Sequence, residues 1–330
     1  RPKIGKKVNP YHTLLSEFML QQTTVKTVIP YFNKFVIKYP NVFEFAKADL
    51  NEILTDWSGL GYYRRARNLH KTCKIICEDY NGNIPKNLKL LKSFPGIGDY
   101  TASAILAIGF NINSNVIDGN IERVICRVGR ISKPINEVKK EVKLYSLKYL
   151  PNSKISYYVQ GLMDIGATIC RPSKTYCHLC PVEIFCKVSN SNAAFNLPNR
   201  REKIKKPVRK AKLLSLVKNR ESILLVKNAD NGLFANMYVL PSSGLDGKEN
   251  EIMNGFNEIG RKKTTFKLNY SFTNFDLKAS IILIEIEKKD LKKLNLSSNF
   301  TKFKNLNSKP LPTLIKKVIR LVTDYYKINV

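Results

Sequence analysis

The sequence predicts a mainly α-helical region followed by a smaller α+β region, and three observations support this division. A chain of 330 residues is long enough for two ordinary domains, each with its own core. Apolar residues recur at helical spacing through most of residues 11–165, whereas short β-type runs dominate from residue 213 onward. Between them, residues 188–211 are rich in Ser, Asn, Lys and Arg, a composition typical of a linker. We therefore expect domains at residues 1–187 and 212–330.

In chain order, the periodicity of apolar residues predicts helices and strands in two separate groups. Pro30 lies inside the second expected helix and is a candidate for a kink there. The expected helices cover residues 11–22, 25–39, 49–55, 64–79, 139–149, 155–165 and 311–326. The expected strands cover residues 213–217, 222–226, 238–240, 267–272 and 277–287.

The composition is strongly basic, with 56 Lys and Arg against 26 Asp and Glu and a formal net charge of +30. Such an excess predicts a polyanionic partner, and nucleic acid is the first candidate because Lys and Arg neutralise phosphates. A Lys- and Asn-rich composition without functional meaning is the alternative. No apolar run has the length of a membrane span and no leader peptide is evident, so we expect a soluble, intracellular protein. Because the sequence begins at Arg1, we expect further residues before it.

Four of the seven cysteines gather in one loop, with the spacing C-x6-C-x2-C-x5-C. Four thiolates that converge suit a tetrahedral zinc ion or an iron–sulfur cluster, and the spacing alone does not choose between them. Two disulfides or free buried thiols are the alternatives. We expect His178 to be a solvated loop residue, and Cys73, Cys77 and Cys126 to be buried thiols. The four candidate ligands are Cys170, Cys177, Cys180 and Cys186.

Two carboxylates have settings that suit chemistry, although each also has an ordinary explanation. Glu17 lies among the apolar residues of the first expected helix, where an exposed helical glutamate is the alternative. Asp118 follows an apolar run and opens Asp118-Gly-Asn120 at the start of a helix, where it could be a plain N-cap.

Two glycine-rich segments suit contact with DNA. The stretch 57–67 combines glycines, Tyr62 and three arginines, which can bend the backbone, wedge between bases and bind phosphates, although core aromatics beside a basic helix face would look alike. The stretch 94–102 has the helix-hairpin-helix pattern, in which Gly96, Gly98 and the following helix direct backbone amides at a phosphate.

Together these segments resemble the endonuclease III and MutY families of DNA glycosylases, and most closely the MutY-type adenine DNA glycosylases. The cysteine loop is similar to their [4Fe–4S] loop, and residues 16–23 and Asp118-Gly-Asn120 are similar to their catalytic segments. The resemblance covers residues 9–187 densely and 212–330 loosely. It implies a helix-hairpin-helix glycosylase region with an iron–sulfur loop, followed by an α+β Nudix-like domain that reads the lesion.

The resemblance also implies an activity and residue roles. The expected reaction is hydrolytic removal of adenine mispaired with 8-oxoguanine or guanine, in base-excision repair. Glu17 would be the general acid, Asp118 would stabilise the cationic sugar, and Tyr100 and Asn120 would orient them. Tyr100 stands where lyase relatives have a nucleophilic lysine, so we expect no strand cleavage. The expected cofactor is a [4Fe–4S] cluster on the four cysteines, and the expected DNA-binding residues are Gln22, Tyr62, Gly96, Gly98 and Arg123.

In the C-terminal region, Phe272-Thr273-Asn274 corresponds to the family's Phe-Ser-His loop and is expected to recognise the lesion, with a neutral amide in place of an imidazole. We expect a monomer that works on double-stranded DNA in the cytoplasm, at the nucleoid. Three alternatives stay open: an endonuclease III-like glycosylase and AP lyase acting on damaged pyrimidines, a DNA-binding scaffold, and a Nudix hydrolase. The last is disfavoured because no R-E-x-x-E-E acid cluster occurs.

Overall fold

The protein was described from a computed structural model, which covers residues 8–199, 205–245, 261–286 and 300–328. By their contacts the residues form two compact units, one of Arg1–Lys47 with Asn68–Lys203 and one of Ala48–Arg67 with Ile204–Val330. Each unit is considered by itself below.

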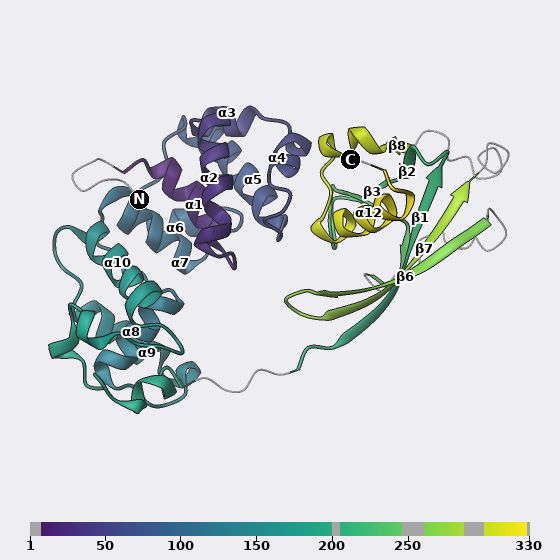
Figure 1. Ribbon diagram of the computed structural model, residues 1–330. Helices are drawn as coiled ribbons and strands as arrows, with labels where there is room; N and C mark the ends of the chain where they lie inside the picture. Colours follow the sequence, from purple (N-terminus) through teal and green to yellow (C-terminus); the bar gives the residue numbers. More distant parts are fainter. Residues whose placement is uncertain (1–7, 200–204, 246–260, 287–299, 329–330) are drawn as a thin grey trace. The chain divides into compact units, whose positions relative to one another are not determined.

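The first unit is helical, and its centre is α1 (Pro10–Leu20). Asn9 caps this helix by accepting the Tyr11 amide at 2.9 Å, which satisfies one of the free amide groups of its first turn. Leu14, Leu15, Phe18 and Met19 are fully buried, so nearly the whole surface of α1 lies against its neighbours. Helix α1 contacts α2 and α7 and the π-helical turn that continues α7 (Figure 1).

The other helices of this unit follow from caps and apolar spacing. They are α2 (Val25–Lys38), α3 (Val42–Lys47), α5 (Arg64–Tyr80), α6 (Leu88–Ser93), α7 (Asp99–Ala104), α8 (Gly119–Gly129), α9 (Ile135–Lys148) and α10 (Ile155–Asp164). Two π-helical turns extend α7 and α10, at Ile105–Gly109 and Ile165–Ile169. The predicted helices are confirmed to within a few residues. Helix α2 runs through Pro30 as one helix, and α3 was not predicted.

The second unit is α+β, as the sequence predicts. Its main sheet has the order β6-β7-β1-β2-β8, and β1 and β7 are parallel over their whole length while the other pairs are antiparallel. A short β5 also pairs with β1, and β3 and β4 form a separate ribbon. The strands are β1 (Val208–Lys218), β2 (Ser222–Leu224), β3 (Val226–Lys227), β4 (Tyr238–Val239), β5 (Ser242–Ser243), β6 (Arg261–Ser271), β7 (Asp276–Ile286) and β8 (Phe300–Lys302).

Helix α12 (Thr313–Tyr326) covers this sheet and packs its apolar side chains into the core of the unit. Leu314, Ile315, Val318 and Val322 of α12 are buried in one cluster with apolar side chains of β1 and β7. All four predicted strands between residues 213 and 272 exist, and β6 is longer than expected. The predicted strand 277–287 is β7, and residue 287 itself lies outside the described residues.

The second unit also takes in residues 48–67, which contain α4 (Leu50–Asp56) and the glycine-rich segment. This grouping differs from the predicted boundaries at 1–187, 188–211 and 212–330, because residues 48–67 contact the C-terminal region and residues 188–203 group with the helical unit. The boundaries of independently folding domains therefore stay a prediction. Within the described residues, no helix combines the length and the apolar character needed to cross a bilayer.

Candidate active site

Glu17 is buried inside the helical unit, with 5% of its surface exposed. The pKa of this carboxyl is raised from 4.5 to about 7, chiefly by burial and to a smaller extent by nearby Asp118, while a hydrogen bond with the Tyr100 side chain opposes the shift. The second oxygen, Oε2, has no hydrogen-bond partner among the described residues. A carboxylic acid that keeps its proton near neutral pH and has a free oxygen is suited to general acid catalysis.

Asp118 is the N-cap of α8, and it also lies next to this acid. Its Oδ1 accepts hydrogen bonds from the backbone amides of Asn120 at 2.9 Å and Ile121 at 2.7 Å. Its Oδ2 accepts a third from the Asn120 side chain at 3.0 Å. The capping function considered from the sequence is therefore real, and it fixes the carboxylate close enough to Glu17 and Tyr100 to affect the pKa of both.

A path of hydrogen bonds joins Asp118 to the cysteine loop through Asn120 and Arg123. The guanidinium of Arg123 donates to Asn120 Oδ1 at 2.9 Å and to the carbonyl of Cys170 at 2.9 Å. It also donates to the carbonyls of Gly119 at 3.1 Å and Gly166 at 2.6 Å. Arg123 is buried, so the structure corrects the prediction that it contacts DNA. It holds α8 against the residues that lead into the cysteine loop.

Gly166 allows this close approach. A Cβ at position 166 would lie 2.6 Å from the Cβ of Asn120 and 3.0 Å from its backbone, closer than such atoms come without movement. The absence of a side chain at Gly166 therefore sets the position of Asn120, and with it that of Asp118.

The helix-hairpin-helix turn lies between α6 and α7. Gly96 adopts φ +80°, and a Cβ there would lie 2.8 Å from both the Asn68 Cβ and a ring carbon of Phe18, so this position needs glycine. Gly98 is the N-cap of α7 and has open space beside it. Gln21 fixes the turn from α1 by donating to the carbonyl of Gly96 at 3.3 Å. The turn thus offers helix-start amides on an open side, as phosphate binding requires.

Gln22 and Tyr62, two of the residues predicted to bind DNA, share an unusual backbone conformation. Both are exposed, and both have left-handed conformations, with φ +56° at Gln22 and +47° at Tyr62. Residues other than glycine seldom adopt this conformation, and they do so more often at functional sites. Tyr62 has 42% of its surface exposed although it belongs to a largely buried segment.

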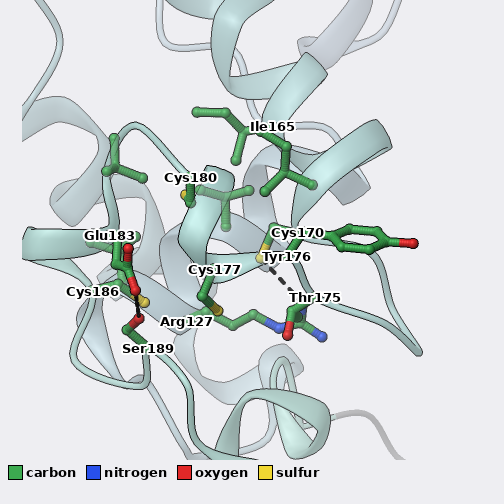
Figure 2. A pocket seen from close by; sticks show the side chains of 14 residues that line it. Arg127, Ile165, Cys170, Thr175, Tyr176, Cys177, Cys180, Glu183, Cys186 and Ser189 are labelled. Carbon is green, nitrogen blue, oxygen red and sulfur yellow. Dashed lines mark hydrogen bonds between the residues drawn. The ribbon is translucent and has the colours of Figure 1, made fainter.

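The cysteine loop follows α10 and its π-helical turn. Figure 2 shows Cys170, Cys177, Cys180 and Cys186 around one pocket, whose remaining wall includes Ile165. Cys177 begins one short 3-10 turn (Cys177–Leu179) and Cys180 ends it, while Cys186 ends a second turn (Glu183–Phe185). Burial raises the pKa of the Cys180 and Cys186 thiols, and the neighbouring cysteines raise it further.

Arg127 supports this loop from beneath, with 1% of its surface exposed. Its guanidinium donates to the Cys170 sulfur at 3.2 Å (Figure 2). It also donates to the carbonyls of Arg171 at 2.8 Å and Pro172 at 3.1 Å. Among the described residues, no three His, Cys, Asp or Glu side chains converge tightly enough to hold a metal ion. Four thiols around one pocket, with the Arg127 cation at their edge, could nevertheless hold an anionic metal centre.

A second pocket, of about 490 Å³, lies inside the C-terminal unit. It brings Tyr62 together with Phe272, Thr273 and Asn274, which are the residues predicted to recognise the lesion. Thr273 and Asn274 are exposed, whereas Phe272 stacks on Phe275 with ring centroids 4.5 Å apart and is half-buried. Phe272 thus supports the loop, and the other two carry its accessible polar groups.

Sequence reasoning missed Arg127 and Gly166. Arg127 is one helical turn after Arg123 in the apolar stretch of α8, and two arginines at that spacing on a buried face were a signal that a polar partner lies opposite. No local pattern around Gly166 distinguishes it, because its partner Asn120 is distant in the sequence.

The comparison with protein families gives the class of this protein. Residues 15–151 match the model described as "HhH-GPD superfamily base excision DNA repair protein", a range that contains Glu17, the glycine-rich turns and Asp118. The helical unit is therefore that of a base-excision DNA glycosylase of the helix-hairpin-helix class.

Curated relatives narrow this class. The chain is 32% identical over 316 residues to the adenine DNA glycosylase of Buchnera aphidicola subsp. Schizaphis graminum, a match that covers 94% of this chain and 91% of that relative. It is 43% identical over 197 residues to the enzyme of the same name from Buchnera aphidicola subsp. Baizongia pistaciae, covering 60% of this chain and 56% of the relative. The chain belongs to the adenine DNA glycosylase family.

Several solved structures are similar in fold to the C-terminal region. The C-terminal domain of mouse MUTYH, crystallised with human PCNA, is 13% identical, and the match covers 37% of this chain and 91% of that domain with a TM-score of 0.26.

Proposed function

We propose that this chain is a monofunctional glycosylase that excises adenine from A:8-oxoguanine and A:G mispairs in double-stranded DNA. The observation that carries the proposal is Glu17, a buried acid with a pKa raised to about 7, a free oxygen and Asp118 beside it. Family membership supplies the substrate class, since its relatives are named adenine DNA glycosylases. Preference for 8-oxoguanine opposite the adenine is part of the proposal.

The chemistry follows from the two carboxyl groups. With the adenine flipped out of the DNA helix and placed against this acid, Glu17 donates its proton to a ring nitrogen of the base as the glycosidic bond breaks. The bonding electrons leave with the base, and the sugar becomes cationic. The Asp118 carboxylate, held by three hydrogen bonds, stabilises that cation until water adds to the anomeric carbon and returns a proton to the acid. Tyr100 orients Glu17, and Asn120 orients Asp118.

We further propose that Cys170, Cys177, Cys180 and Cys186 hold a [4Fe–4S] cluster. When bound, the cluster would have a structural role, because it would join two 3-10 turns and the end of α10 into one rigid loop. Arg127 would compensate its negative charge. Cys180→Ser should lose iron and reduce DNA affinity, whereas Cys77→Ser, outside the loop, should retain the iron. Zinc without iron in the purified protein would contradict the cluster.

DNA binding would combine three features of the chain. The net charge of +30 favours phosphate contact, the amides at Gly96 and Gly98 suit one backbone phosphate, and the exposed Gln22 and Tyr62 suit insertion between bases. Thr273 and Asn274 would contact the base opposite the adenine from the C-terminal pocket. We place this activity on chromosomal DNA in the cytoplasm and expect a monomer.

The test is single-turnover cleavage of duplexes that contain one A:8-oxoguanine, A:G or A:T pair, with the products resolved with and without alkali. We expect release from both mispairs, little from A:T, and strand breaks only after alkali. Breaks without alkali would indicate a glycosylase/lyase, and DNA binding without base release would indicate a scaffold.

A further inference from the structure

The glycine-rich segment that carries Tyr62 is fastened to the C-terminal region by two side-chain hydrogen bonds. Ser58 is buried, and its hydroxyl donates to the carbonyl of Leu311 at 2.6 Å, across 253 positions of sequence. Arg67 donates through Nη1 to the carbonyl of Ala235 at 2.8 Å, across 168 positions. Both bonds lie within the second unit, which groups residues 48–67 with Ile204–Val330.

Between these two attachments the segment is held by its own side chains. The buried guanidinium of Arg65 donates to the carbonyls of Leu60 at 3.1 Å and Gly61 at 3.0 Å, and it lies 5.5 Å from the Trp57 ring and 5.6 Å from the Tyr62 ring. Burial lowers the pKa of Arg65 to about 10, so it remains a cation at neutral pH. The indole of Trp57 also donates to Gly61, at 3.3 Å. These contacts fix the left-handed backbone that makes Tyr62 protrude.

The turn at residues 271–276, which lines the same C-terminal pocket as Tyr62, is also fixed by hydrogen bonds. Phe272 donates its amide to the carbonyl of Phe275 at 2.8 Å, and the Ser271 hydroxyl donates to Asp276 at 2.6 Å, which closes the turn between β6 and β7. Lys206, which lies just before β1, donates to the carbonyl of Phe272 at 2.7 Å. The Tyr62 segment and the turn at Phe272–Phe275 are thus each fixed internally. The width of the pocket between them then depends on how the Tyr62 segment is attached to the C-terminal region.

We propose that Ser58 and Arg67 are positioning residues for mispair recognition, because they lock the Tyr62 segment onto the C-terminal region and so preassemble the pocket that receives the purine opposite the excised adenine. This inference rests on the proposed function and deepens it. A preformed pocket avoids the entropy cost of ordering two loops on binding. It also lets a small difference between purines be read, because the walls cannot move to accommodate the wrong base.

The chain contains one built-in probe for this idea. Trp57 is its single tryptophan, it is fully buried, and it lies in the segment that Ser58 and Arg67 fasten. Its fluorescence, and the access of the neutral quencher acrylamide to it, therefore report on this segment without any requirement for activity.

The experiment uses the full chain with Ser58→Ala, Arg67→Met and the double variant. Each lost hydrogen bond should reduce the single-turnover rate ratio of A:8-oxoguanine to A:G by about three- to ten-fold, in line with the net strength of a buried hydrogen bond. Acrylamide quenching of Trp57 should rise by about two-fold or more in the double variant. Ser146→Ala is the matched control, because Ser146 is a buried serine that donates to Asn115 at 2.7 Å in the helical unit. It should change neither measurement.

Two results would overturn the inference. One is a double variant whose Trp57 quenching rises while the rate ratio stays at the wild-type value, and the other is a lower ratio with unchanged quenching. Since Arg67 is only half-buried, Arg67→Met tests the idea even where Ser58→Ala does not fold. Failure of the proposed function would be a separate result. If the wild-type chain released no adenine, acrylamide quenching of Trp57 would still measure whether Ser58 and Arg67 hold the segment on the C-terminal region.

Discussion

The acid site of the helical unit and the pocket of the C-terminal unit place their polar groups in opposite ways. Glu17 is 5% exposed and Asp118 has both oxygens engaged, whereas Thr273 and Asn274 are exposed and Tyr62 is 42% exposed. Proton transfer to a poor leaving group needs an acid whose pKa is raised, and burial achieves that. Reading a base needs groups that DNA can reach. The proposed roles therefore place the chemistry in a desolvated site and the recognition of the base in a solvated one.

The largest effect should come from Glu17→Gln, which removes the proton donor and preserves the shape. We expect single-turnover adenine release to fall by about 100- to 10,000-fold, the usual contribution of a general acid. Duplex affinity, measured by fluorescence anisotropy, should change little. Glu44→Gln is the control, because Glu44 is an exposed glutamate of α3. A Glu17→Gln enzyme that cleaves at the wild-type rate would refute the assigned role.

Asp118→Asn should give the next largest effect. Loss of the charge that faces the cationic sugar should slow adenine release by about 100-fold or more. Asparagine is as good an N-cap as aspartate, so the melting temperature should move by only a few degrees. If the melting temperature collapsed instead, the capping role would dominate, and the loss of activity would carry no information on the chemistry.

The raised pKa of Glu17 predicts two opposite responses to pH. Adenine release should be constant below about pH 7 and fall about ten-fold per pH unit above it, because only the protonated acid works. For stability, the folded state holds this proton more tightly than the unfolded state between pH 4.5 and about 7, so stability decreases as pH rises through that window. The shift corresponds to about 3 kcal/mol.

Glu17→Gln should therefore be more stable than the wild type at pH 8 and about equally stable at pH 4. Urea unfolding at both pH values measures this difference. An equal stability difference at pH 4 and pH 8 would show that the pKa of Glu17 is not raised.

The smallest expected effects lie in the exposed loop. Thr273→Val and Asn274→Ala should each reduce the rate ratio of A:8-oxoguanine to A:G by about three- to ten-fold, because each removes one neutral hydrogen-bonding group. The absolute rate on A:G should stay near the wild-type value. A variant that slowed both substrates equally would show that the loop supports folding or general DNA binding rather than recognition.

Most of the fold could be predicted because its signals are local. Apolar spacing and caps placed α1, α5, α10 and α12 to within a few residues. The segments 16–23 and 118–120 predicted Glu17 and Asp118 as catalytic residues. The sequence could not show that burial and Asp118 together raise the pKa of Glu17. That effect depends on contacts between residues 101 positions apart in the chain, from 17 to 118.

Two other features that the sequence did not predict also depend on contacts between residues distant in the chain. The attachment of residues 48–67 to the C-terminal unit depends on single hydrogen bonds to the backbone carbonyls of Leu311 and Ala235, and backbone carbonyls leave no trace in a sequence. The burial of Arg123 was missed because a basic residue near a DNA-binding motif suggested a phosphate contact.

Gly166 changes how natural variation in this protein should be interpreted. It contributes no side chain and lies 48 positions from Asp118, yet one added methyl group would collide with Asn120 at 2.6 Å. The displacement would pass through Asn120 to the carboxylate that it orients. We therefore expect Gly166→Ala to slow adenine release although it removes no catalytic group, so the space around a residue matters as much as its chemistry when variants of this protein are assessed.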